Sequence, residues 1–209
     1  MAVKKQNEIA VSIPFDKIKR IQIYDNPKGK SLATIMRETG ADYAINGTLY
    51  NMRTKAAVCP LRIDGITKFS GPYKYWGYAW NKDNPSSFRM IVVPDYDWDN
   101  WIACSLILRA GAVVKNMIYN SAMGGSRGRT AIGVKFVDGE RRLCFYVSAD
   151  RKGYQKTPQK LAHLLEKYGW ENAIMLDGGG SSQGYFKKER RQVFSSRRVA
   201  HYILVYMKG

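Results

Sequence analysis

Short β-rich runs separated by turn residues recur along this chain, and only a few stretches have a helical pattern. The strongest local signal is a hairpin, in which residues 130–137 and 143–148 flank a connection that begins with Asp138-Gly139. Asp-Gly favours the tight turns that join antiparallel strands. Strands and helices do not alternate regularly, which argues against a parallel sheet built from β-α-β units. The pattern predicts an α+β fold, a single domain around a mostly antiparallel mixed sheet with few helices.

The predicted helices are marked by their caps. One begins after Ser31 and ends at Gly40, and another opens at Thr157-Pro158 and ends at Gly169. A Ser or Thr N-cap, a proline in the first turn and a glycine after the last turn are the usual signals. The other predicted elements are a short helix over 98–105, a loop over 81–87, and strands over 18–24, 41–45, parts of 61–93, 173–176, 183–186 and 199–207.

The length of 209 residues fits one domain, and 45% hydrophobic residues supply enough apolar material for a core. We predict a domain over residues 18–209 after an N-terminal extension over residues 1–17. No apolar run approaches the roughly 18 residues that a membrane-spanning helix needs. The basic N-terminus lacks the apolar stretch that follows in a signal peptide. The sequence therefore predicts a cytoplasmic protein without a membrane span.

The chain carries 34 Lys and Arg against 17 Asp and Glu, a formal net charge of +17. Such a charge attracts anionic partners but does not specify a fold. We interpret the basic cluster at residues 187–191 as a solvated face. No nucleic-acid-binding motif accompanies the charge, so nucleic acid is the disfavoured partner.

The three cysteines, Cys59, Cys104 and Cys144, lie far apart among apolar residues and form no Cys-x-x-Cys pair. A disulfide framework or a zinc site would need clustered pairs. The spacing therefore predicts small buried apolar side chains in a reducing compartment.

The segment most suggestive of chemistry is residues 174–182, IMLDGGGSS. A short buried strand ends there in Asp177, three glycines and two serines. Consecutive glycines cost conformational entropy on folding, and they let a ligand approach backbone N–H groups closely. A tight turn alone would not need so long a glycine and serine run. The segment is not a phosphate-binding loop of the Walker type, because no Gly-Lys-Ser/Thr and no helix follow it.

Two further strand ends carry polar side chains. Arg129-Thr130 begins the first strand of the predicted hairpin after a glycine-rich stretch, and Asn46-Gly47 ends the strand over residues 41–45. An arginine can grip a phosphate through two parallel N–H bonds. Either pair alone would be an unremarkable strand boundary.

Four segments, taken together and in this order, resemble the phosphodiester glycosidase family. They are Asn46-Gly47, RTAIG at 129–133, LDGGGSS at 176–182 and RRVAH at 197–201. The resemblance covers residues 18–207, and its relatives include bacterial and phage members. It implies hydrolysis of a sugar-1-phosphodiester, and hence an anionic phosphodiester-containing small molecule or polymer as the partner.

The resemblance also implies roles for the matching residues. Asp177 would be the catalytic acid/base or nucleophile, and Asp150, which follows the hairpin, its partner carboxylate. Arg129 would hold the phosphate, with Arg197 as a second cation, and Asn46 would bind substrate oxygens or order the loop around them. The other implied substrate- or phosphate-binding positions are Thr130, Gly178, Gly179, Gly180, Ser181, Ser182 and His201.

The chain departs from the family pattern beside these positions. Arg151-Lys152 follows Asp150, and Arg198 and His201 stand where Pro and Asn are common. These departures motivate an alternative function, a non-catalytic binder that sequesters a phosphorylated sugar or nucleotide-type ligand in the same pocket. No cofactor is implied with certainty, and a divalent cation held by Asp177 and Asp150 stays open.

Overall fold

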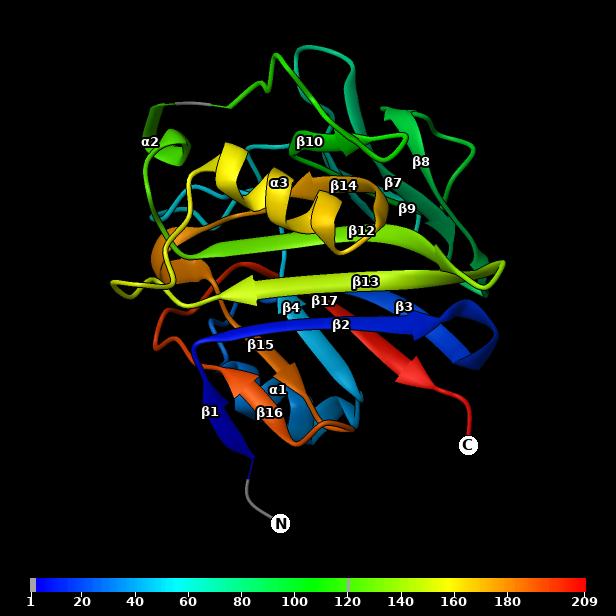
Figure 1. Cartoon of the computed structure of the whole chain (residues 1–209). Helices are drawn as coiled ribbons and strands as arrows, with labels where there is room; N and C mark the ends of the chain where they lie inside the picture. Colours follow the sequence, from blue (N-terminus) through cyan, green and yellow to red (C-terminus); the bar gives the residue numbers. More distant parts are fainter. Residues whose placement is uncertain (1–2, 120) are drawn as a thin grey trace.

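The computed structural model describes residues 3–119 and 121–209, which form three mostly antiparallel sheets with two longer helices (Figure 1). The α+β prediction is confirmed, with the strands divided among three sheets rather than one. Among the described residues, no helix is long and apolar enough to cross a membrane.

The first sheet contains the predicted hairpin and is covered by helix α3 (Pro158–Lys167). Its strand order is β11 (Ala112–Val113), β10 (Ser105–Arg109), β14 (Trp170–Met175), β12 (Arg129–Val137), β13 (Glu140–Ser148) and β2 (Glu8–Pro14). The hairpin turn consists of Asp138 and Gly139, whose φ values of 51° and 78° are the left-handed conformation that such turns require. The predicted cap of α3 is confirmed, because the Thr157 hydroxyl accepts a hydrogen bond from the Lys160 N–H at 3.2 Å.

The second sheet contains strands from both ends of the chain. Its strand order is β1 (Lys4–Gln6), β16 (Arg191–Val193), β15 (Gly184–Phe186), β4 (Tyr43–Asn46), β17 (His201–Met207) and β3 (Ile18–Asp25). Helix α1 (Leu32–Thr39) covers one face, with the predicted Ser31 cap and with Gly40 at φ 70° after its last turn. The segment predicted as an N-terminal extension forms β2, which pairs with β13, the helical turn η1 (Phe15–Lys17), and β1, which pairs with β16.

The third sheet differs from the predicted elements in two places. Its strand order is β6 (Ile66–Phe69), β5 (Leu61–Ile63), β9 (Asn100–Ala103), β7 (Tyr75–Asn81) and β8 (Asn84–Val93). The helix predicted over 98–105 is wrong, because that segment forms β9 and the start of β10. Strand β9 is buried on both faces, so its apolar run has no alternation to distinguish it from a helix. The loop predicted over 81–87 is also wrong, since β8 begins at Asn84 and pairs with Asn81.

The main core joins all three sheets. Its fully buried members include Ile21, Tyr78, Ile102, Ile132, Phe145 and Ile203, which come from β3, β7, β9, β12, β13 and β17. Burying each such side chain contributes roughly 1.5–3 kcal/mol. Since the sheets share this core, the loops that join them are held in place from several sides.

Candidate active site

The site predicted from the sequence lies where the chain crosses from the first sheet to the second. After β14, the Leu176 N–H donates to the Thr130 carbonyl at 2.8 Å, still in the first sheet. The next N–H, that of Asp177, donates to the Gly47 carbonyl at 3.2 Å, at the end of β4 in the second sheet. The chain then makes one tight helical turn, η2 (Gly179–Ser181), and enters β15. We call residues 177–182 the glycine loop.

Asn46 holds this crossing together. Its side-chain oxygen accepts from the Thr130 hydroxyl at 2.6 Å and from the Gln183 N–H at 3.1 Å. Its amide nitrogen donates to the Asp177 carbonyl at 2.8 Å. Asn46 and Thr130 are both fully buried. Of the two roles given to Asn46 by the resemblance, this geometry corresponds to ordering the loop.

The glycines of the loop are required by close backbone neighbours. A Cβ on Gly178 would lie 2.8 Å from the Gly128 carbonyl oxygen, closer than real Cβ atoms come to backbone. Gly179 donates its N–H to the same carbonyl at 2.9 Å and has a φ of 59°, which side chains rarely adopt. The two glycine-rich segments of the sequence therefore pack against each other.

Asp177 is half-buried at the start of the loop. Burial raises the pKa of its carboxyl above the usual value, and the Ser181 hydroxyl, the Gly178 N–H and the charge of Arg197 offset part of this. The Gly178 N–H donates to one carboxyl oxygen at 2.9 Å. A carboxyl whose pKa is raised by burial, yet which has donors ready for its anion, suits acid/base or nucleophilic chemistry.

Ser181 connects Asp177 to two further groups. Arg197 donates to the Ser181 hydroxyl oxygen at 3.2 Å, and its guanidinium lies directly over Gly180. The Tyr50 hydroxyl also interacts with the Ser181 hydroxyl and is close enough to Asp177 for that charge to raise the pKa of Tyr50, although burial raises it more. Tyr50 is a site residue that the sequence analysis missed. Its only signal is its position four residues after Asn46.

Arg129 is buried beside the glycine loop, and its Nη1 nitrogen lies 3.6 Å from where a Gly178 Cβ would be. Its side chain is 1% exposed, its Nε donates to the Lys156 carbonyl at 2.6 Å, and another nitrogen donates to the Gly125 carbonyl. Burial, and then the charge of Arg127, lower the pKa of Arg129 to about 10, so it remains a cation at neutral pH. Arg129 thus fixes the 125–128 loop from inside. The exposed Arg127 also approaches the glycine loop, with its Cδ 3.9 Å from where a Gly179 Cβ would be.

Asp150 contacts the glycine loop from a different side. One of its carboxyl oxygens accepts from the Gly128 N–H at 2.8 Å and from the Gln155 side chain at 2.9 Å. The other lies 3.6 Å from the position of a Gly179 Cβ. None of the hydrogen bonds between described residues joins Asp150 to Asp177. Across the described chain no group of three His, Cys, Asp or Glu side chains has a geometry suited to a metal ion.

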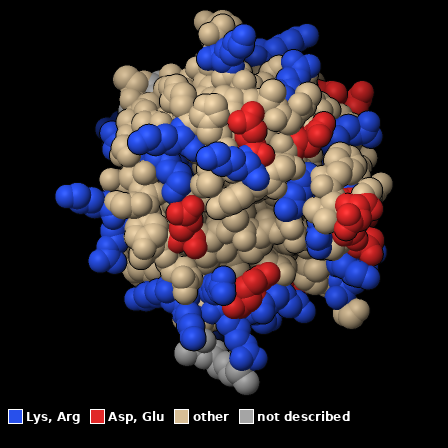
Figure 2. All heavy atoms as spheres, in the orientation of Figure 1, with Lys and Arg blue, Asp and Glu red and all other residues tan. Residues whose placement is uncertain are grey.

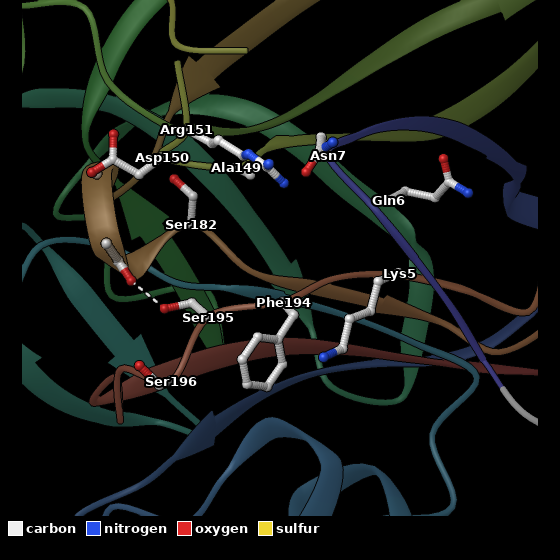
Figure 3. Close-up of a pocket in the computed structure, with 12 residues that line it drawn as sticks. Lys5, Gln6, Asn7, Ala149, Asp150, Arg151, Ser182, Phe194, Ser195 and Ser196 are labelled. Atoms are coloured by element: carbon white, nitrogen blue, oxygen red, sulfur yellow. Dashed lines mark hydrogen bonds between the residues drawn. The ribbon is translucent and has the colours of Figure 1, made fainter. Parts of the chain in front are cut away.

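A cavity of about 490 Å³ opens beside the glycine loop (Figure 3). Gly179, Gly180 and Ser182 form one wall, and Asp150-Arg151 and Lys5 form others. Asp177 does not line this cavity. The loop therefore has two faces, one with Asp177, Tyr50 and Arg197 and one on the cavity.

Two of the three cysteines contact each other, which the sequence analysis did not predict. The Cys59 and Cys104 sulfur atoms lie 4.0 Å apart, as free thiols. The hydrogen bond with Cys104 lowers the pKa of Cys59. The same contact and burial raise the pKa of Cys104, and the charge of Asp177 raises the pKa of both thiols. Cys144 is buried elsewhere, and burial raises its pKa to about 12. The thiol pair therefore lies behind the Asp177 face of the glycine loop.

His201 is 3% exposed, and its Nδ1 has no hydrogen-bond partner among the residues that the structure describes. Burial lowers its pKa from 6.5 to about 4; the charge of Asp25 opposes this and that of Lys68 adds to it. The unfolded chain takes up a proton below about pH 6.5 that the folded protein resists until about pH 4. We expect His201 to remove about 3 kcal/mol of stability as the pH falls through this window.

The variant His201→Asn tests this, because Asn does not titrate there. Its free energy of unfolding, measured by urea denaturation from pH 7 to pH 4, should fall less steeply than that of the wild type. His163→Asn, on the exposed surface of α3, is the matched control and should keep the wild-type slope. Equal slopes for His201→Asn and the wild type would contradict the assignment.

Comparisons with known proteins agree with this fold. A family model described as phosphodiester glycosidase matches residues 39–206. The catalytic domain of zebrafish N-acetylglucosamine-1-phosphodiester alpha-N-acetylglucosaminidase, auto-inhibited by its pro-peptide, has a TM-score of 0.68 at 14% identity over 100% of this chain and 87% of that chain. A hypothetical protein from Synechocystis has a TM-score of 0.73 at 15% identity over 96% of this chain and 59% of that chain.

A third solved structure, a putative exported protein from Burkholderia pseudomallei, has a TM-score of 0.59 at 11% identity over 95% of this chain and 73% of that chain. No curated protein matches the chain. The solved structures share the fold, and the family model spans most of the sequence, including the glycine loop and its partners. The chain therefore belongs to the phosphodiester glycosidase family.

Proposed function

We propose that this protein hydrolyses the glycosidic bond of a sugar-1-phosphodiester and releases the sugar from a phosphomonoester. The observation that carries the proposal is the pairing of a half-buried carboxyl, Asp177, with two exposed arginines on one glycine loop. Arg127 reaches Gly179 and Arg197 covers Gly180. The two arginines can bind a phosphate. The carboxyl on the same loop can then act as acid/base or nucleophile on the glycosidic bond next to that phosphate.

Cleavage of a sugar-1-phosphodiester needs fewer catalytic carboxyl groups than most glycosidases use. Those enzymes employ two carboxylates, one of which protonates a poor leaving group. A phosphate ester leaves readily once its charge is neutralised, so Arg127 and Arg197 take over much of the work of a general acid. Preorganised donors of this kind are each worth roughly 3–4 kcal/mol of transition-state stabilisation. Asp177 then serves as the acid/base or the nucleophile, with Tyr50 and Ser181 holding its carboxyl in place.

Phosphomonoester release from a small panel tests the proposal. The panel contains UDP-GlcNAc, the methyl diester of GlcNAc-1-phosphate, and linear and cyclic ADP-ribose-type compounds. Turnover of one class supports a phosphodiester glycosidase and identifies its substrate class. Tight, stoichiometric binding without turnover would overturn it in favour of the alternative, a protein that sequesters a phosphorylated ligand at the same loop.

The substitution Arg197→Gln should change both rate and pH dependence. The Arg197 charge lowers the pKa of Asp177, so its removal raises that pKa further. The limb of the pH–rate profile that reports Asp177 should therefore move to higher pH. The value of kcat/KM should also fall by on the order of 100-fold, because one phosphate contact is lost. Arg191→Gln, an exposed arginine of β16, is the control. A limb that stays in place or moves to lower pH would contradict this role.

A further inference from the structure

Three cavities follow one another across the surface that begins at the glycine loop. The first, of about 490 Å³, shares Lys5, Phe194, Ser195 and Ser196 with a second of about 370 Å³. The second meets a third, of about 470 Å³, at Ala33 on α1. We call this series the basic groove. Each cavity has the size of a typical small-ligand pocket, so the series has room for an extended chain rather than for one sugar phosphate.

The basic groove holds a concentrated positive charge. The cations that line it are Lys5, Arg37, Arg151, Lys187, Arg190 and Arg198. Asp150 is the one acid among the lining residues, and one of its oxygens is already bound by Gly128 and Gln155. None of the six cations forms an ion pair with a described residue. Figure 2 shows Lys and Arg gathered at the lower end of the molecule, where Figure 1 places β1 and β16.

Hydroxyl and amide groups line the first two cavities of the groove. They belong to Gln6, Asn7, Ser31, Ser182, Gln183, Gln192, Ser195 and Ser196. Ser182 is 2% exposed, and its buried hydroxyl forms no hydrogen bond within the described part of the chain. Its side chain points toward Asp150 on the cavity wall (Figure 3). A groove that supplies cations along its length, with hydroxyls and amides in its first two cavities, suits a ligand that carries repeated phosphates and polar sugar groups.

We propose that the basic groove binds a polymer of sugars joined by phosphodiesters along the surface that ends at the cavity face of the glycine loop. The inference rests on the proposed function for the chemistry at the loop and adds the class of substrate. Nucleic acid is the other polyanion of this kind, but single strands bind through stacking on aromatic side chains. Phe194 and Tyr185 are the only aromatic residues among those that line the groove. The solvated face expected at residues 187–191 thus contributes two cations to the groove.

The test reverses charge at the far end of the groove, away from the glycine loop. The variant combines Arg37→Glu, Lys187→Glu and Arg190→Glu. Its matched control combines Lys19→Glu, Lys74→Glu and Lys82→Glu, exposed lysines that do not line the groove. The substrates are an oligomer of several GlcNAc-phosphate repeats and the methyl diester of GlcNAc-1-phosphate, which has a single linkage.

We expect the groove variant to lose at least tenfold in kcat/KM on the oligomer and to keep wild-type activity on the methyl diester. Its oligomer affinity should also depend less steeply on salt, since fewer counterions are released. The control variant should match the wild type on both substrates. Equal losses on both substrates, or no loss on the oligomer, would overturn the proposal.

Two further measurements keep the outcomes distinct. Single-stranded DNA that binds more tightly than the oligomer, and that loses affinity in the groove variant, would overturn the sugar-phosphate assignment in favour of nucleic acid. If neither substrate is turned over, direct binding of the oligomer decides. Binding that the groove variant loses supports the groove while the proposed hydrolase activity fails. If the groove variant still binds the oligomer as the wild type does, the proposal that the groove binds the polymer is overturned as well.

Discussion

Asp177→Asn should abolish turnover of the sugar-1-phosphodiester while the protein stays folded and still binds it. Asn has the shape of Asp, and its side-chain oxygen can still accept the Gly178 N–H that the carboxyl accepts at 2.9 Å. It cannot exchange a proton near neutral pH or form a covalent glycosyl ester. We expect kcat to fall by on the order of 10³-fold or more, which is within the range of acid/base catalysis.

Three measurements separate chemistry from folding in this variant. Phosphomonoester release gives kcat, calorimetric titration gives the affinity, and thermal unfolding gives Tm. An unchanged affinity and Tm with lost turnover is the expected result. Activity within tenfold of the wild type would show that Asp177 is not the reacting group.

Asp150→Asn is the informative comparison. The Asn oxygen can still accept from Gly128 and Gln155, so the loop should keep its structure. A loss of kcat as large as that of Asp177→Asn would support the two-carboxylate mechanism implied by the family resemblance. A small loss would support a mechanism with one acid assisted by arginines.

Local signals in the sequence were sufficient to predict the helix starts and the hairpin turn, because these depend on interactions between neighbouring residues. The caps at Ser31 and Thr157 and the turn at Asp138-Gly139 act through hydrogen bonds and backbone conformation within a few positions. The structure confirms all three. The hairpin in turn places Arg129 and Asp150 near the glycine loop, because these residues begin one hairpin strand and follow the other.

The third sheet could not be predicted in the same way. Trp101 and Ile102 are completely buried, and β9 pairs with β5 on one side and β7 on the other. The pairing partners lie twenty or more positions away in the sequence. An apolar run without alternation fits a short helix as well as a central strand, so only tertiary pairing settles it.

In the candidate site, too, the sequence predicted what depends on neighbouring residues and missed what depends on contacts between distant parts of the chain. The sequence identified the glycine loop and Asp177, because an acid with three glycines after a buried strand is unusual within one short window. It did not distinguish the buried Arg129 from the exposed Arg127, since both stand beside glycines and burial depends on packing under Lys156. Tyr50 and the Cys59–Cys104 pair also escaped notice. Their partners come from other parts of the chain, and no local pattern marks such contacts.

Gly128→Ala should strongly destabilise the protein. A Cβ there would lie 2.6 Å from the Asp150 backbone nitrogen and 2.9 Å from the Ser148 carbonyl oxygen. These are main-chain atoms that follow β13, so they cannot rotate away as a flexible side chain would. Overpacking of this kind costs about 1–3 kcal/mol and sometimes more. For a domain of this length each kcal/mol lowers Tm by about 2–4 °C, which thermal unfolding measures.

The same substitution should reduce activity beyond what the lost stability explains, even when the assay is run well below Tm. The Gly128 carbonyl accepts the Gly179 N–H at 2.9 Å, so any displacement at Gly128 moves the glycine loop that carries Asp177. Gly125→Ala is the matched control from the same segment, because the nearest atom to its Cβ is a side-chain atom of Arg127 at 3.9 Å. Its Tm and kcat should equal those of the wild type. If the two alanine variants behaved alike, the packing of the two glycine-rich segments against each other would not be what holds Asp177 in position.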